Sequence, residues 1–243
     1  MLSNWAMIKR TFGLLRRNWV LAMGGSCVST ALGLVDLLLM MCYYDYVLEA
    51  GAALTWWGVL ALVAIMAFML FSSGALSYGQ AVVYLDMVRS ERGRFSGYFS
   101  GVGLALSLGL FMLVVGVGVT LGTVLLVVPG VLFYLFYGQV FYVATEQAEL
   151  GLKAAMRQSA ALTKGRRLKL FWIQLFLIIF ALLLFVPIGI LSHYLINRFA
   201  LEPLWSNVIS MTLSFFVMPY FSMLFALFYD ELRGSSRHDE AVE

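Results

Sequence analysis

One acidic side chain, Asp36, lies deep within an apolar run and is the first candidate for chemistry in this sequence. No Lys or Arg lies in the interior of any apolar run, where it could neutralise this carboxyl. An ionised carboxylate in the hydrocarbon of a bilayer is costly, so Asp36 is expected either to carry a proton or to face water. The functional interpretation is a proton or cation site, and the alternative is a hydrogen-bonded structural residue.

The second candidate is a set of cations that lies between the apolar runs. They form a candidate basic face for binding lipid headgroups or an acidic partner: Arg89, Arg92, Arg94, Lys153, Arg157, Lys164, Arg166, Arg167 and Lys169. Each cation near an anionic membrane surface contributes about 1 kcal/mol of binding. The alternative is that these residues only set the topology and anchor the spans.

The residue types that catalysis or metal binding would need do not occur in suitable patterns. The sequence has no phosphate-binding GxxxxGK[ST], no GxSxG and no HExxH, and its two histidines, His193 and His238, are expected on opposite faces. Cys27 and Cys42 are about 22 Å apart if they share one helix, too far for a disulfide. We therefore expect no enzyme activity, no cofactor, no metal site and no nucleic-acid partner.

The composition places these candidates in a membrane. Hydrophobic residues make up 62% of the 243 residues and charged residues only 12%, against about 25% charged in soluble domains. Six runs have the length of about 20 residues that a bilayer needs. They predict an all-α polytopic protein, one integral membrane domain over 1–243, with spans at about 20–44, 56–78, 101–123, 124–146, 168–192 and 207–229 and a tail at 230–243.

The distribution of cations orients these spans. With six spans, every Lys and Arg except Arg198 falls on one side of the membrane. The positive-inside rule makes that side cytoplasmic and places both termini there. The run that begins after Arg17 is too long for a cleaved signal peptide, so we expect it to remain as the first span.

The third and fourth runs are nearly continuous and must fold back as a hairpin, because a single helix over 101–145 would be about 67 Å long. Pro129-Gly130 is the turn signal between them, although a reversal one or two turns earlier is equally open. Gly101, Ala105 and Gly109 recur at every fourth residue, which favours close approach of helix backbones.

Two segments outside the spans have the pattern of amphipathic helices lying in the headgroup plane. Trp5, Ile8, Phe12, Leu15 and Trp19 form one stripe of the first segment. In the second segment, 150–164, an apolar side is flanked by cations. The members of that apolar side are Leu152, Ala155, Met156, Ser159, Leu162 and Thr163.

Acids recur after the second, fourth and sixth runs. Tyr78-Gly79-Gln80 and Tyr137-Gly138-Gln139 precede Asp86 and Glu146, and Pro219-Tyr220 similarly precedes Asp230. One interpretation is three related helical hairpins, since internal repeats are common in membrane transporters. The other is that every membrane interface needs such aromatic and charged anchors.

The second half carries three further patterns: VVPG at 127–130, AAMRQSAALTKGRR followed by LKLFW up to Trp172, and the closing PYFSMLFALFYDELR. In these patterns it resembles a broad group of uncharacterised bacterial inner-membrane proteins. The group includes the YciC-like proteins and the membrane domain attached to some glycerophosphodiester phosphodiesterases. It implies a six-helix bacterial inner-membrane domain near lipids, and no phosphodiesterase activity, because the chain lacks that soluble domain.

Two hypotheses of function follow. The first is a non-enzymatic accessory or scaffold protein that engages membrane lipids, another membrane protein or a second copy of itself through the basic face. The second is a small transporter or proton-coupled carrier that uses Asp36.

Overall fold

The computed structural model describes residues 3–50, 55–125, 127–147, 152–199 and 204–240, and it contains only helices within these ranges. The long helices are α2 (Trp19–Ala50), α3 (Trp56–Ser90), α4 (Ala105–Leu125), α8 (Arg167–Phe199) and α9 (Leu204–Glu240). The shorter ones are α1 (Asn4–Arg17), the 3-10 turns η1 (Phe95–Phe99) and η2 (Val102–Leu104), α5 (Val127–Tyr137), α6 (Val140–Glu146) and α7 (Leu152–Leu162). The all-helical fold class is confirmed.

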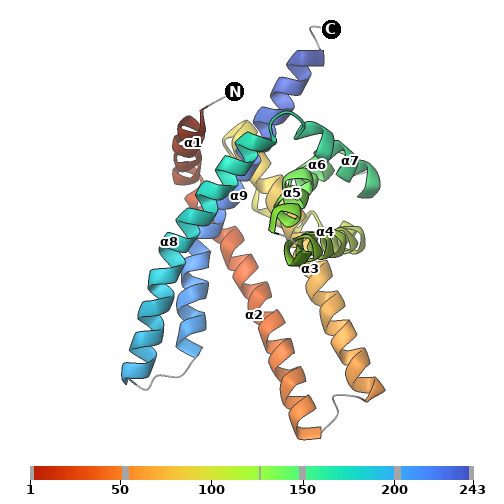
Figure 1. The fold of residues 1–243 in the computed structure, drawn as a ribbon, viewed down its shortest axis with the longest axis vertical. Coiled ribbons are helices and arrows are strands. Elements are labelled where there is room, and N and C mark those ends of the chain that lie inside the picture. The colour runs from red at the N-terminus through yellow and green to blue at the C-terminus, as the bar shows by residue number, and fades with distance from the viewer. Residues whose placement is uncertain (1–2, 51–54, 126, 148–151, 200–203, 241–243) are drawn as a thin grey trace.

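Four long helices form two pairs that diverge from a common end of the molecule. α2 and α3 form one pair, α8 and α9 form the other, and both chain termini lie at the common end, at the top of Figure 1. The segments that carry the cations, apart from Arg198 near the far end of α8, gather at this same end. We call it the basic end.

Among the described residues, five helical segments are long and apolar enough to cross a membrane: Trp19–Val47, Trp56–Ser90, Phe95–Val124, Arg167–Leu195 and Ser214–Gly234. The predicted fourth span, 124–146, is not one continuous helix, since it is divided between α5 and α6 at Gly138-Gln139. Glycine weakens a helix, and α6 turns to pack against α3, with Val140, Tyr142 and Val143 buried. The prediction of six spans is therefore not confirmed. The predicted tail, 230–243, continues α9 as far as Glu240, and 241–243 lie outside the described residues.

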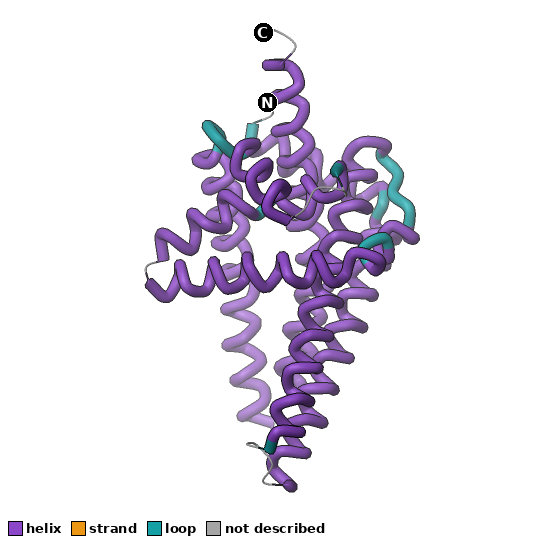
Figure 2. The backbone as a smooth tube through the Cα atoms, turned by 90° about the vertical axis from the view of Figure 1, so that its right-hand side faces the viewer, coloured by secondary structure: helices purple, strands orange, loops and turns teal. Residues whose placement is uncertain are grey.

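The predicted hairpin of the third and fourth runs is present as α4 and α5. α4 runs across the direction of the four long helices, as Figure 2 shows, and α5 packs back on it. The reversal lies between Leu125 and Val127, just before Pro129, which occupies the first turn of α5 where proline is tolerated. Residue 126 itself lies outside the described residues.

Glycines on α3, and on the chain that runs from η1 into α4, let these two segments approach each other closely. A Cβ atom on Gly79 would lie 2.1 Å from the carbonyl oxygen of Tyr98, and one on Gly101 would lie 2.3 Å from that of Ala75. A Cβ on Gly109 would lie 2.1 Å from the ring of Phe71. The predicted packing role of Gly101 and Gly109 is thus confirmed.

The packed core lies at the basic end. It joins the carboxyl-terminal halves of α3 and α9 with α6, and α1 and α7 cover it. Towards the far end, apolar side chains such as Leu38, Val63 and Leu183 are exposed on α2, α3 and α8. Apolar exposure on this scale is stable only in lipid, so the chain is a membrane-embedded protein.

Local signals fix where the helices at the basic end begin and end. The Ser3 side chain accepts a hydrogen bond from the Ala6 N–H at 3.2 Å, which caps α1. α3 ends where Glu91 adopts the left-handed conformation at φ 58°. Asn18, between α1 and α2, connects the end of α1 to the end of α3, because its amide donates to the carbonyls of Leu14 at 3.2 Å and Glu91 at 3.0 Å.

The two predicted amphipathic segments are helices, but each packs against the protein. α1 buries Met7, Thr11 and Leu14, and this face differs from the predicted aromatic stripe. α7 buries Ala155 and Ser159 on its predicted apolar side, and the Ser159 hydroxyl donates to the carbonyl of Phe136 at 2.9 Å. The side chain of Leu152 lies outside the described residues.

Candidate functional site

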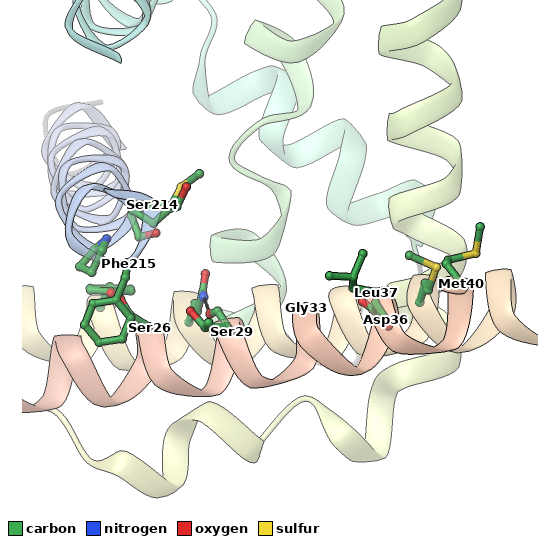
Figure 3. A pocket seen from close by; sticks show the side chains of 15 residues that line it. Ser26, Ser29, Gly33, Asp36, Leu37, Met40, Ser214 and Phe215 are labelled. Atoms are coloured by element: carbon green, nitrogen blue, oxygen red, sulfur yellow. Dashed lines mark hydrogen bonds between the residues drawn. The ribbon is translucent and has the colours of Figure 1, made fainter. Parts of the chain in front are cut away.

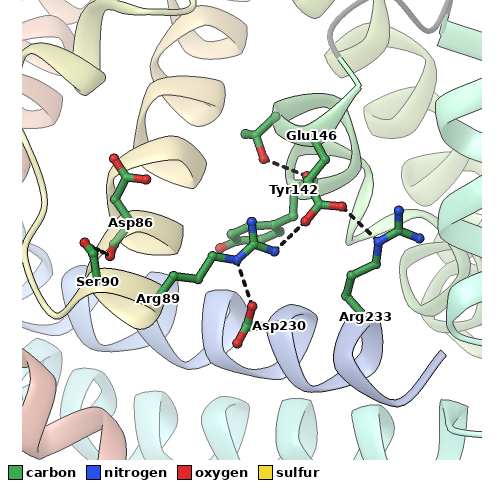
Figure 4. A network of polar contacts seen from close by, with 8 residues as sticks. Asp86, Arg89, Ser90, Tyr142, Glu146, Asp230 and Arg233 are labelled. Carbon is green, nitrogen blue, oxygen red and sulfur yellow. Dashed lines mark hydrogen bonds and ion pairs between the residues drawn. The ribbon is translucent and has the colours of Figure 1, made fainter. Parts of the chain in front are cut away.

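A network of ion pairs joins three helices at the basic end (Figure 4). The Arg89 guanidinium, from α3, pairs with Glu146 at the end of α6 and donates through Nε to Asp230 of α9 at 2.8 Å. Arg233, one turn after Asp230 in α9, forms an ion pair with the second oxygen of Glu146, at 3.0 Å from its Nε. Arg89 therefore serves as the link between α3, α6 and α9.

Glu146 is the centre of this network, with only 13% of its side chain exposed. Burial alone would raise the pKa of this carboxyl, but the hydrogen bond and the charge of Arg89 outweigh it. A hydrogen bond from Tyr229 and the charge of Arg233 act in the same direction, and the pKa is held below its ordinary value of 4.5. A carboxyl whose pKa is lower in the folded state stabilises the fold above its ordinary pKa. That contribution is lost as the pH falls through the lowered value.

The other predicted members of the basic face divide into two groups. Arg167 stacks on the Phe136 ring at 3.9 Å, and Lys169 lies 3.6 Å from Glu231, so both are held by the protein. Arg166 is half-buried and also makes an interaction within the protein. The exposed group consists of Arg92, Arg94, Lys153, Arg157 and Lys164. These five side chains are presented outward at the basic end, where a headgroup could reach them.

An aromatic pocket of about 870 Å³ lies where α1 meets α8 and α9. The predicted stripe of α1 contributes Trp5, Ile8, Phe12, Leu15 and, at the start of α2, Trp19. The Phe12 ring lies 4.9 Å from that of Tyr220 in α9, which in turn lies 6.5 Å from Phe180 in α8. Arg16 is the charged residue of the lining described. The pocket thus joins an apolar, aromatic wall to one guanidinium near the end of α1.

Asp36 lies in a second pocket, a groove of about 640 Å³ between α2, α3 and α9. Figure 3 shows Ser26, Ser29, Gly33 and Asp36 along the side of α2 that borders this groove. Asp36 contributes a buried oxygen, Oδ1, that has no hydrogen-bond partner in the part of the chain that the structure describes. The candidate proton or cation site therefore borders open space rather than packed side chains.

Residues 53–236 match the family described as "Protein of unknown function (DUF975)". The chain belongs to the DUF975 family. The network of Arg89, Glu146 and Asp230 lies inside the range that this family shares, whereas Arg16 and Asp36 precede it. No curated protein and no solved structure matches the chain. Membership of an uncharacterised family agrees with the prediction, while the narrower resemblance to YciC-like proteins stays a prediction.

Sequence reasoning identified Asp36 but missed the polar stripe around it. Ser26, Ser29, Thr30, Gly33 and Asp36 follow the pattern i, i+3, i+4, i+7 and i+10, which places all five on one face of a helix. A search for polar residues at helical spacing within the first run would have found this stripe in the DUF975 chain. The Arg89 network gave no such signal, because Arg89 and Asp230 are 141 residues apart.

Proposed function

We propose that this DUF975 protein is a non-enzymatic accessory protein of a bacterial inner membrane that engages anionic lipid headgroups at its basic end. The aromatic pocket carries the proposal. Its volume of about 870 Å³ is in the range of sites that bury a small molecule or lipid fragment. Its apolar wall suits an acyl chain, and Arg16 suits the phosphate at the end of that chain.

The rest of the basic end supports the same function. Arg92, Arg94 and Arg157 are exposed there, and so are the aromatic residues Trp5 and Trp19, which are typical of the membrane–water interface. The positive-inside rule favours a cytoplasmic position for this end and for both termini. The inner leaflet would then present its anionic headgroups to the pocket.

The proposal predicts a preference for anionic lipid that depends on Arg16. Delipidated protein in a mild detergent is titrated with phosphatidylglycerol or phosphatidylcholine, and bound lipids are counted by native mass spectrometry. Arg16→Gln is expected to weaken phosphatidylglycerol binding about fivefold, equivalent to about 1 kcal/mol for one cation, with little effect on phosphatidylcholine. Arg10→Gln is the matched control, because Arg10 is an exposed cation of the same helix outside the pocket lining.

Two outcomes would count against this function. Equal binding of the two lipids by the wild type would remove the anionic preference. Unchanged phosphatidylglycerol binding in Arg16→Gln would mean that the anionic preference does not arise at this pocket. In either case a membrane protein or a second copy of the chain would become the better partner for the exposed cations.

The groove at Asp36 favours a second candidate, a small proton-coupled carrier. A carboxyl that borders open space inside the bundle is the group that such a carrier needs. In proteoliposomes with a pH gradient, Asp36→Asn is expected to abolish proton flux, recorded by an internal pH-sensitive dye, without loss of the fold. Fully retained flux would remove Asp36 from the mechanism.

A further inference from the structure

The groove between α2, α3 and α9 has one polar wall, formed by α2, in an otherwise apolar part of the molecule. Along α2 the lining residues follow helical spacing over about four turns: Ser26, Ser29, Thr30, Gly33, Asp36, Leu37 and Met40. Figure 3 shows this side of α2, with Ser214 and Phe215 of α9 across from it. The α2 stripe is thus one continuous wall of a single site.

Two lining residues have polar atoms that the protein does not satisfy. Ser26 is only 6% exposed, and its hydroxyl has no partner among the described residues. Oδ1 of Asp36 is also buried and has no hydrogen-bond partner among the described residues. By contrast, the Gln80 amide of α3 donates to the Ser29 hydroxyl at 2.8 Å. Leaving a buried polar atom without a partner is unfavourable, so the groove favours an occupant that hydrogen-bonds to Ser26 and Asp36.

α9 adds an acceptor on the opposite wall. Phe215 and Pro219 both line the groove, one helical turn apart. Proline has no N–H, so the carbonyl of Phe215 cannot receive the usual hydrogen bond from the residue four positions later. Ser214 and Ser222 place hydroxyls on the same wall. Acceptors therefore border the groove on two helices.

The charge and the apolar part of the lining define the ligand. Asp36 is the charged residue among the described lining side chains, which include no Lys or Arg, so the field in the groove favours a cation. Met40, Met69 and Met218 contribute polarisable thioethers, and Tyr84 and Phe215 contribute aromatic rings. These groups suit the apolar body and the charge of an organic cation.

We propose that this groove binds an amphiphilic organic cation, such as a protonated amine, with its charged nitrogen at Asp36 and its apolar body against the methionines and Phe215. The volume of about 640 Å³ is appropriate for a ligand of this size. The inference shares Asp36 with the carrier candidate but concerns binding alone. Binding without proton flux would remove the carrier candidate and leave this inference standing.

The test uses the full chain in phosphatidylcholine nanodiscs and rhodamine 6G, a fluorescent organic cation, with fluorescence anisotropy as the readout. Asp36→Asn keeps the size and polarity of the side chain but removes its charge, so it is expected to weaken binding at least tenfold. Asp45→Asn is the matched control, because Asp45 is exposed on α2 and does not line the groove. Carboxyfluorescein, an anion with a similar ring system, is expected not to bind above empty nanodiscs.

A second variant tests the groove without touching the carboxyl. A Cβ atom on Gly33 would meet nothing within 4 Å, so Gly33→Leu adds a side chain to open space without a clash. It is expected to block rhodamine 6G binding while the protein stays folded. Unchanged affinity in Asp36→Asn or Gly33→Leu would overturn the inference. Equal loss in Asp45→Asn, or equal binding of carboxyfluorescein, would overturn it as well.

Discussion

Replacing Gly79 with alanine is expected to lower the free energy of unfolding by about 3 kcal/mol. The new Cβ atom would lie 2.1 Å from the carbonyl oxygen of Tyr98 and 2.6 Å from its carbon. Both are backbone atoms, so neither can rotate away. Tyr98 cannot move easily either, because it is buried and its hydroxyl donates to the carbonyl of Leu21 in α2 at 3.2 Å. The clash would therefore separate α3 from η1 or shift α2 as well.

The matched control is Gly116→Ala in α4, where a Cβ atom would meet nothing within 4 Å. Alanine favours a helix over glycine by about 1 kcal/mol, so this variant is expected to be as stable as the wild type or slightly more so. Thermal unfolding in the same detergent compares the two. A Gly79→Ala protein that unfolds at the wild-type temperature would mean that α3 and η1 do not approach as closely as described.

The second large effect is expected for Arg89→Ala, which removes the link between α3, α6 and α9. It would leave Glu146 without one of its two arginines and Asp230 without the bond to the Arg89 guanidinium. Hydrogen bonds between charged groups contribute about 1.5–3 kcal/mol, and the partial exposure of Arg89 and Asp230 reduces their value. We expect a loss of about 2 kcal/mol, or roughly 4–8 °C in the unfolding temperature.

Arg89→Lys and Arg10→Ala distinguish the effect of losing the network on stability from the effect of losing one positive charge. Lysine keeps the positive charge but cannot span both carboxylates in the same planar geometry, so an intermediate loss is expected. Arg10 is exposed on α1, and its removal is expected to change stability by less than about 0.5 kcal/mol. If Arg10→Ala were as destabilising as Arg89→Ala, the effect would belong to net charge and not to the network.

The sequence predicted the helical class and most of the long helices because their signals are local. Apolar length located α2, α3, α8 and α9, and the run of small residues from Gly101 indicated close packing. The fourth span is not confirmed as one helix, because apolar length alone could not reveal the break at Gly138, after which α6 packs against α3 and α9.

The candidate sites differ in how many of their residues could be identified from local sequence pattern. Asp36 was found because a charge inside an apolar run is visible without a fold. Glu146 and Asp230 stood out only as acids after apolar runs, while Asp86, the third of that set, is exposed and outside the ion pairs that join them to Arg89. Arg89 itself was predicted as part of a basic face that binds lipid headgroups or an acidic partner. Its pairing depends on contacts between distant segments, which spacing along the chain does not encode.

The aromatic pocket shows the same limit. The stripe of Trp5, Ile8 and Phe12 was expected to lie in the headgroup plane, and in the structure these three side chains line one pocket. The stripe forms one wall of a pocket with Phe180 and Tyr220, and this depends on how α1 packs against α8 and α9. The sequence alone therefore predicted contact with lipid but not a defined place for it.

A structure of the protein in nanodiscs that contain phosphatidylglycerol would show directly whether an anionic lipid occupies this pocket. We expect acyl-chain density between Phe12, Phe180 and Tyr220, with headgroup density within hydrogen-bond distance of Arg16. A pocket filled by the protein's own side chains, or a lipid whose headgroup lies away from Arg16, would contradict it.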